Sequence, residues 1–114
     1  MNLEELKNLR LKELDIKYKP IIKDYNDNTE IVNSITIESD DTIDIIICKL
    51  YILTNNVAKT LKLLTSSEYR INNRKITSTD ISQALKNINK SETNPIKLFA
   101  KKQYINNKKR CPHI

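Results

Sequence analysis

The 114-residue sequence contains no glycine and no tryptophan. Loops that cradle phosphates and nucleophile elbows need glycine for positive φ angles and for close approach of the backbone. A P-loop and a dinucleotide-binding fingerprint are therefore excluded. Long apolar runs are missing too, since the longest covers only residues 45–48. A membrane-spanning helix needs about 20 apolar residues, so no membrane partner is expected.

Cysteine and histidine are scarce. Cys48 lies in an apolar run and is expected to be a buried thiol, whereas Cys111 lies in a polar tail beside His113, the only histidine. Such different settings do not form a disulfide framework, which indicates a reducing, intracellular compartment. Cys111 and His113 supply only two of the four ligands of a structural zinc site, so we expect no metal and no cofactor. No nucleophile has a base at a recognisable spacing, so we expect no enzymatic activity.

Acidic residues nearly disappear from the second half of the chain. Residues 1–44 hold 11 acidic and 6 basic side chains, whereas residues 45–114 hold 3 acidic and 14 basic ones. The first ten residues are charged throughout, unlike a secretory signal peptide. A half-chain this basic is a candidate polyanion binder. Abundant lysine alone accounts for the net charge of +6, but not for the loss of acids.

Apolar spacing predicts an all-α chain that begins with two helices. Leucines at positions 3, 6, 9, 11 and 14 indicate a first helix, in an N-terminal extension formed by residues 1–17. Pro20 is expected to interrupt it, because proline disfavours helix in the residue before it. A short helix over residues 20–33 and a short extended segment over residues 34–39 follow.

The clearest pattern begins after residues 39–41, an acidic sequence suited to a helix N-terminus. Neither glycine nor proline interrupts the chain before Asn72, and apolar residues recur at steps of three and four, at Ile43, Ile46, Ile47, Leu50, Leu53, Val57, Leu61 and Leu64. We therefore predict one central helix of about 30 residues, two to three times the usual length. Because it is apolar on more than one face, a partner chain is expected to cover part of it.

Residues 71–88 combine a basic patch with a helix start. Arg74 and Lys75 precede a short extended segment, and the sequence from Thr77 to Asp80 is a capping-box pattern. One side of the following short helix carries Ile81, Ala84, Leu85 and Ile88. A further helical pattern follows Pro95 and ends in a basic tail, so that residues 91–114 form a C-terminal helix and tail.

This order of elements resembles the histone fold over about residues 18–90. The sequence "RKITSTDISQAL" is similar to the second loop and third helix of core histones, and "SITIESDDTIDIII" is similar to their first loop and the start of their central helix. Two departures stand out. The chain between Ile37 and Ile76 is about one helical turn longer. The arginine that clamps the acid at the Asp80 position would fall at Asn73, so Arg74 would have to form the clamp through a shifted loop.

The resemblance implies a handshake dimer with another histone-fold chain, either identical or different, and possible nucleosome-like assembly. Paired loops would bind double-stranded DNA through its phosphates. The implied interface comprises Ile43, Ile46, Ile47, Leu50, Leu53, Val57, Leu61, Leu64, Ile76, Ile81 and Leu85. The implied DNA ligands are Lys19, Lys23, Ser34, Thr36, Asn73, Arg74, Lys75, Thr77, Lys101, Lys102, Lys108, Lys109 and Arg110.

We therefore expect a protein that packages DNA without sequence specificity, in a nucleus, a virion or a viral factory. The alternative is a histone-fold subunit that serves as an assembly module in a transcription, centromere or DNA-repair complex. A third interpretation is a small helical protein with an accidental resemblance, for which a monomer is expected. Each basic cluster also has a simpler explanation as a solvated surface, a complement to a helix dipole or a solubilising tail.

Overall fold

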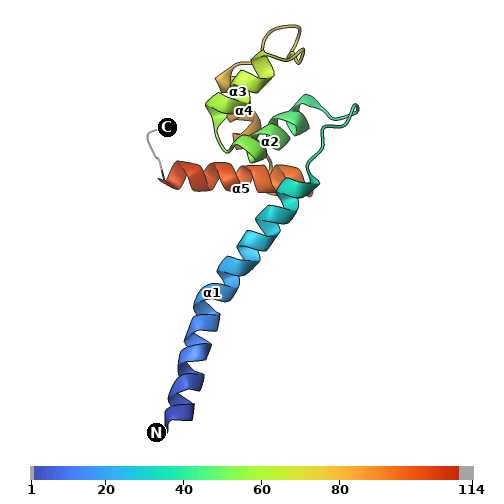
Figure 1. The fold of residues 1–114 in the computed structure, drawn as a ribbon. Helices are drawn as coiled ribbons and strands as arrows, with labels where there is room; N and C mark the ends of the chain where they lie inside the picture. The colour runs from blue at the N-terminus through green and yellow to red at the C-terminus, as the bar shows by residue number, and fades with distance from the viewer. Residues whose placement is uncertain (1, 111–114) are drawn as a thin grey trace. The chain divides into compact units, whose positions relative to one another are not determined.

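The computed structural model describes residues 2–110, and this part of the chain is all-helical. Its helices are α1 (Leu3–Ser34), α2 (Ile43–Thr54), α3 (Val57–Thr65), α4 (Ser78–Lys86) and α5 (Pro95–Arg110) (Figure 1). The predicted all-α class is confirmed. The chain divides into two compact units, one formed by α1 and one that begins at Ile35. The sequence had suggested boundaries after residues 17 and 90 instead.

The first unit is one uninterrupted helix of 32 residues, with Pro20 inside it and no buried residue. The predicted break at Pro20 is therefore wrong. Proline lacks the N–H group that would bond to the carbonyl four residues earlier, so α1 forms with that bond missing. Ion pairs one turn apart support the helix on both sides of Pro20, from Lys19 to Asp15 at 3.5 Å and from Lys23 to Asp27 at 3.4 Å.

A buried lysine fixes the segment before α2. Lys49 is only 9% exposed, and its Nζ donates to the carbonyl of Thr36 at 2.7 Å and to Oδ2 of Asp41 at 2.6 Å. The N-cap of α2 is Thr42, whose side chain accepts from the Ile45 amide, so the helix begins just after the predicted capping residues. Residues 35–38 have no regular secondary structure, and Lys49 holds this segment against α2.

The predicted single central helix is wrong, because the chain breaks between α2 and α3. Asn55 adopts a left-handed conformation, with φ 54° and ψ 29°. Asn56 then caps α3, and its side-chain oxygen accepts from the Lys59 amide at 2.9 Å. The hydroxyl oxygens of Thr54 and Thr60 lie 2.7 Å apart across the break. Asparagine favours both left-handed and capping positions, so two asparagines suffice where glycine and proline are absent.

The second unit builds its core from all four of its helices. Fully buried side chains include Ile47 and Tyr51 of α2, Leu64 of α3 and Leu85 of α4. Helix α5 lies across α2 and α4 (Figure 1), and its Tyr104 meets Tyr51 edge to face, with 6.0 Å between ring centroids. The C-terminal helix is therefore part of this core.

The eleven predicted dimer-interface residues fall into two groups. Six are buried within this single chain, namely Ile46, Ile47, Leu64, Ile76, Ile81 and Leu85. These six already pack inside one protomer. The other five keep some solvent exposure, namely Ile43, Leu50, Leu53, Val57 and Leu61. All five lie on α2 and α3, so these helices carry the accessible part of the predicted interface.

Candidate nucleic-acid interface

The loop before α4 reverses direction through a two-residue turn. Ile71 and Arg74 exchange two backbone hydrogen bonds, each 3.0 Å long. Between them, Asn72 and Asn73 have φ angles of 51° and 65°. Two successive left-handed residues are the mark of a type I′ hairpin turn, in which asparagine is tolerated. Asn73, a predicted DNA ligand, is therefore part of the turn that sets the position of Arg74.

Arg74 and Asp80 form a two-point ion pair, so the clamp contact is present. Nη1 of Arg74 donates to Oδ2 of Asp80 at 2.7 Å, and Nη2 donates to Oδ1 at 2.8 Å. Oδ2 also accepts from the amide of Thr77 at 2.8 Å and from its hydroxyl at 3.0 Å. One carboxylate thus serves both the clamp and the capping box of α4. The Arg74 guanidinium, followed by the Thr77 amide, lowers the pKa of Asp80.

These contacts change the roles of the predicted loop ligands. The charge of Arg74 is largely neutralised by Asp80, and the Thr77 hydroxyl donates within the loop. Lys75 is exposed and has no ion pair in the described part of the chain. Lys75 therefore keeps an unpaired charge in this loop, while Arg74 and Thr77 hold the loop in shape.

Acid is expected to destabilise the second unit through two carboxylates. The pKa of Asp80 is lowered as described, and the pKa of Asp41 is lowered by its hydrogen bond from Lys49. A carboxyl group with a lowered folded-state pKa stabilises the fold above its unfolded pKa, about 3.9, and loses this effect as the pH falls through the folded value. The Tm should therefore drop steeply below about pH 4.

The Asp80→Asn variant tests this expectation in a thermal unfolding series from pH 7 to pH 2. Its Tm should be lower than that of the wild type at pH 7, and the difference should shrink as the pH falls. Asp40→Asn, at an exposed position next to Asp41 in the chain, is the matched control, and its Tm should follow that of the wild type. A constant difference between Asp80→Asn and the wild type at every pH would contradict the assigned role of the Asp80 charge.

A second basic surface lies between α4 and α5. A hollow of about 380 Å³ is lined by Leu85, Tyr104 and Ile105 and by four lysines, which contribute mainly their aliphatic stems: Lys86, Lys101, Lys108 and Lys109. No carboxylate is among these lining residues. We call this site the lysine hollow. The Lys108 ammonium lies 5.1 Å from the centroid of the Tyr104 ring, a distance suited to a cation–π contact. The Lys101 ammonium donates to the carbonyl of Ile88.

The remaining predicted ligands lie elsewhere. Lys19 and Lys23 are paired with acids on α1. The Ser34 hydroxyl donates to the carbonyl of Ile31, and the Thr36 hydroxyl donates to Glu38. Lys102 is exposed on α5, and Arg110 ends that helix, its side chain lying outside the described part. The structure therefore brings together Lys101, Lys108 and Lys109, and adds Lys86 to them.

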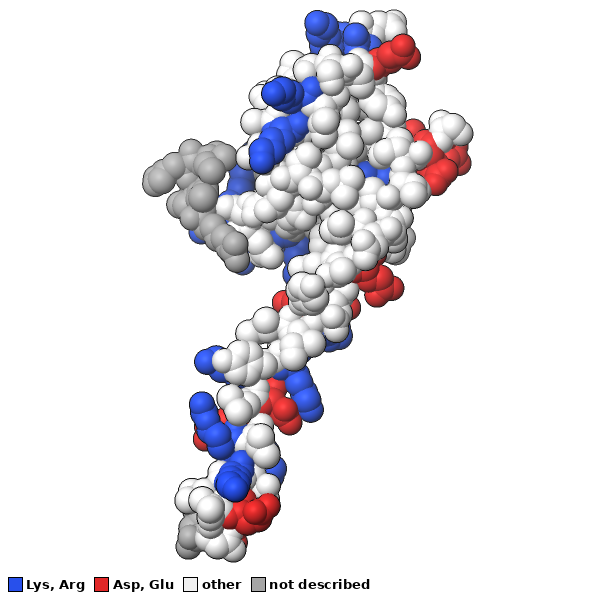
Figure 2. All heavy atoms as spheres, viewed as in Figure 1, with Lys and Arg blue, Asp and Glu red and all other residues white. Residues whose placement is uncertain are grey.

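The second unit is strongly basic outside one short segment. Residues 35–110 carry 14 basic and 7 acidic side chains, and four of the acids lie within residues 38–44. Of the other three, Asp80 is paired with Arg74 and Glu92 with Lys97. In Figure 2, blue side chains are spread over the body of this unit, while red ones collect at its edges. Little negative charge is therefore left to offset the lysines.

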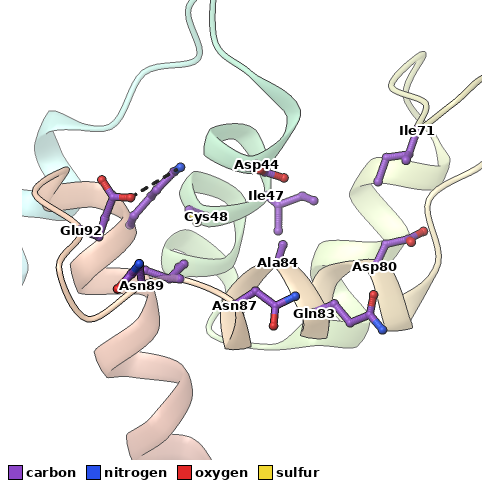
Figure 3. A pocket seen from close by; sticks show the side chains of 12 residues that line it. Asp44, Ile47, Cys48, Ile71, Asp80, Gln83, Ala84, Asn87, Asn89 and Glu92 are labelled. Carbon is purple, nitrogen blue, oxygen red and sulfur yellow. Dashed lines mark ion pairs between the residues drawn. The ribbon is translucent and has the colours of Figure 1, made fainter.

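Another hollow is unsuited to an anion. It measures about 370 Å³, lies between α2, α4 and the start of α5, and is lined by Asp44, Asp80 and Glu92 together with several amides (Figure 3). Its lysine, Lys97, is paired with Glu92 at 3.9 Å, as the dashed line in Figure 3 marks. Carboxylates at this density repel phosphate groups. Of these two hollows, the lysine hollow is therefore the one without carboxylates in its lining.

Cys48 borders the acidic hollow but is not suited to nucleophilic chemistry. The thiol is 1% exposed, as expected from the sequence, and burial raises its pKa to about 11. A thiol with this pKa is protonated near neutral pH and therefore unreactive. Cys111 and His113 lie outside the described residues. Within residues 2–110, no three metal-ligating side chains form a cluster, and no helix has the length and apolarity to cross a bilayer.

Sequence reasoning missed Lys86, because it lies in α4 and sequence distance separates it from the cluster on α5. The packing of α4 against α5 brings them together. The Asn72–Asn73 dipeptide was a turn signal.

Comparison of the sequence and the structure with known proteins found no matching protein family, no matching curated protein and no matching solved structure.

Proposed function

We propose that this chain is a histone-like protein that dimerises and compacts double-stranded DNA through sequence-independent phosphate contacts, without catalysis. The lysine hollow carries the proposal. Four lysines of α4 and α5 border it and no carboxylate lines the site. Ammonium groups bind phosphate oxygens as point charges, and such contacts supply affinity without reading bases. Lys75 adds a further cation on the loop before α4.

The histone-like fold and the dimer are supported by separate observations. The Thr77–Asp80 capping box is present, and Arg74 clamps Asp80 from one position after the one that the resemblance gives. Five residues of the implied interface on α2 and α3 keep solvent exposure, and Leu53 is 49% exposed. A second histone-fold chain would cover these apolar side chains. A nucleus or a virion is the corresponding location, because both hold DNA.

A salt series of DNA binding tests the proposal. The variant Lys86→Gln/Lys108→Gln/Lys109→Gln removes three cations of the lysine hollow and leaves Lys101, which bonds to the backbone. The slope of log K against log salt should become less steep by about three, roughly one for each lysine. Affinities for unrelated duplexes should fall equally. The measurement is fluorescence anisotropy with short duplexes between about 50 and 300 mM salt, a range over which phosphate contacts are strongly screened.

The matched control is Lys7→Gln/Lys12→Gln/Lys17→Gln on α1, which changes the net charge by the same amount. Its slope should stay close to that of the wild type. Equal effects of the two triple variants would show that net charge alone governs binding, and would contradict a site at the lysine hollow. If the wild-type protein fails to bind DNA at low salt, the DNA-binding proposal is wrong.

One observation favours the alternative function of an assembly module. Ten large apolar side chains of α1 are exposed, and they include Ile16 at 78% and Tyr25 at 69%. Exposed apolar surface of this extent marks a protein-contact region. If protein contacts dominate, the triple variant of the lysine hollow should still bind its protein partners. Removing the apolar side chains of α1 should abolish this binding. Pull-down experiments with the two variants distinguish the two functions.

A further inference from the structure

The junction between α2 and α3 combines a broken backbone with an unbroken sequence pattern. Only Asn55 and Asn56 separate the two helices. Yet the apolar steps of three and four continue across them, from Leu50 and Leu53 to Val57 and Leu61. Two helices that meet at a bend do not need such a common phase. The pattern is the one that a single helix requires.

Side chains of α5 hold the break in place. Nε2 of Gln103 donates to the carbonyl of Tyr51 at 3.0 Å. Nδ2 of Asn107 donates to Oδ1 of Asn55 at 2.7 Å and to the hydroxyl of Tyr51 at 2.9 Å. These bonds stabilise the end of α2 and the left-handed residue itself. We call Gln103 and Asn107 the latch.

A surface hollow adjoins the junction. It measures about 570 Å³ and is lined by Asn55, Asn56, Val57 and Ala58 together with residues of α2, α4 and α5. Asn55, Asn56 and Ala58, which line it, are exposed, so the hollow is open to solvent and leaves room for the junction to move. The hollow and the latch lie at the same point, because Asn107 also lines the hollow.

A continuous helix would place the five accessible interface residues on one face. At about 100° per residue, these side chains fall within a stripe about 80° wide if residues 43–65 form one helix. They are Ile43, Leu50, Leu53, Val57 and Leu61. In the broken form, the two helices divide this stripe between them. Joining the helices therefore assembles the apolar face that a partner chain would cover.

We infer that the α2–α3 junction is a two-state hinge, which the latch of α5 holds in the broken form. Release of the latch joins residues 43–65 into one helix and presents the five accessible residues to a second histone-fold chain. This inference rests on the dimer of the proposed function and adds its regulation. A partner chain that binds the joined helix more tightly than the broken form shifts the population toward the joined helix. Binding of the partner therefore drives the change.

A distance measurement between two spin labels tests the hinge. Labels at Asp44→Cys and Lys62→Cys lie on exposed positions of α2 and α3, and Cys111→Ser removes the cysteine of the tail. Cys48 stays, because it is buried and does not react. A continuous helix separates the two Cα atoms by about 27 Å, at 1.5 Å per residue. The broken form gives a shorter distance.

Three variants shift the hinge in defined directions. Asn55→Ala removes a residue suited to the left-handed conformation and supplies a strong helix former, so it should add a population near 27 Å. Gln103→Ala/Asn107→Ala should do the same by removing the latch. Asn55→Gly keeps the left-handed conformation accessible and should retain the short distance. Asn106→Ala, at an exposed neighbour of the latch, is the matched control and should leave the distance unchanged.

The outcomes separate the hinge from the other proposals. The long-distance population should grow with protein concentration, together with the dimer fraction in sedimentation. A single short distance in the wild type, in Asn55→Ala and in the latch variant at every concentration overturns the inference. If the latch variant unfolds, Asn55→Ala decides alone. If the long distance appears but the protein does not bind DNA, the hinge stands and the DNA-binding proposal is wrong. If the protein binds DNA but keeps a single short distance, the DNA-binding proposal stands and the hinge is wrong.

Discussion

Tyr104→Ala should destabilise the second unit by about 3–5 kcal/mol, the range for removing a buried aromatic side chain. Tyr104 is only 7% exposed and packs edge to face against Tyr51, which is 1% exposed. Removing its ring leaves a cavity between α2 and α5 and also removes the partner of the Lys108 ammonium. Urea unfolding followed by circular dichroism at 25 °C measures the loss.

The adjacent residue supplies the control for this prediction. Ile105 is on the same helix but is 42% exposed, so Ile105→Ala should cost well under half as much. If both variants lose little stability, α5 is an appended helix, as the sequence suggested, and not part of the core. The same result would weaken the latch, because Gln103 and Asn107 depend on α5 being docked against α2.

Pro20→Ala should stabilise α1 by about 3 kcal/mol, the cost of proline in a helix interior. The substitution restores the amide that bonds to the carbonyl of Ile16 and removes the clash of the proline ring with that carbonyl. Because α1 has no buried residue, the gain should appear locally. Hydrogen exchange of the amides around position 20 should slow by about 100-fold, which is the same free energy expressed as a rate.

The expected result depends on Pro20 lying inside one continuous helix. At the first position of a helix, proline costs almost nothing, because its missing N–H has no intrahelical partner there. If a new helix begins at Pro20, as the sequence pattern suggested, the alanine variant should exchange at nearly the wild-type rate. Ile22→Ala, at an exposed position of the same helix, controls for a general effect of alanine and should change the exchange by much less.

Local signals in the sequence predicted the elements that depend on local chemistry. The capping-box pattern from Thr77 to Asp80 correctly located the start of α4, because a cap is formed by residues three positions apart. Proline at position 95 likewise marked the start of α5. The apolar residues Ile81 and Leu85 were expected on one side of α4, and both are fully buried.

Features that depend on distant contacts were not predictable in this way. Gln103 and Asn107 bond to a helix end about 50 residues earlier in the chain, and nothing in the spacing of apolar residues records such a contact. The convergence of Lys86 with the lysines of α5 also follows from packing alone. The break at Asn55 lies between these cases, because two adjacent asparagines signal a possible cap, while the contacts with α5 stabilise it.

Asparagine occupies every left-handed position found in residues 2–110, namely Asn55, Asn72 and Asn73. The absence of glycine affects the unfolded chain as much as the folded one, because an unfolded sequence without glycine samples fewer backbone conformations. Glycine at these positions would relieve local strain in the folded state and would enlarge the unfolded ensemble at the same time. The two effects oppose each other. The absence of glycine therefore reduces the entropy that the chain must lose when it folds, and it does so without excluding tight turns.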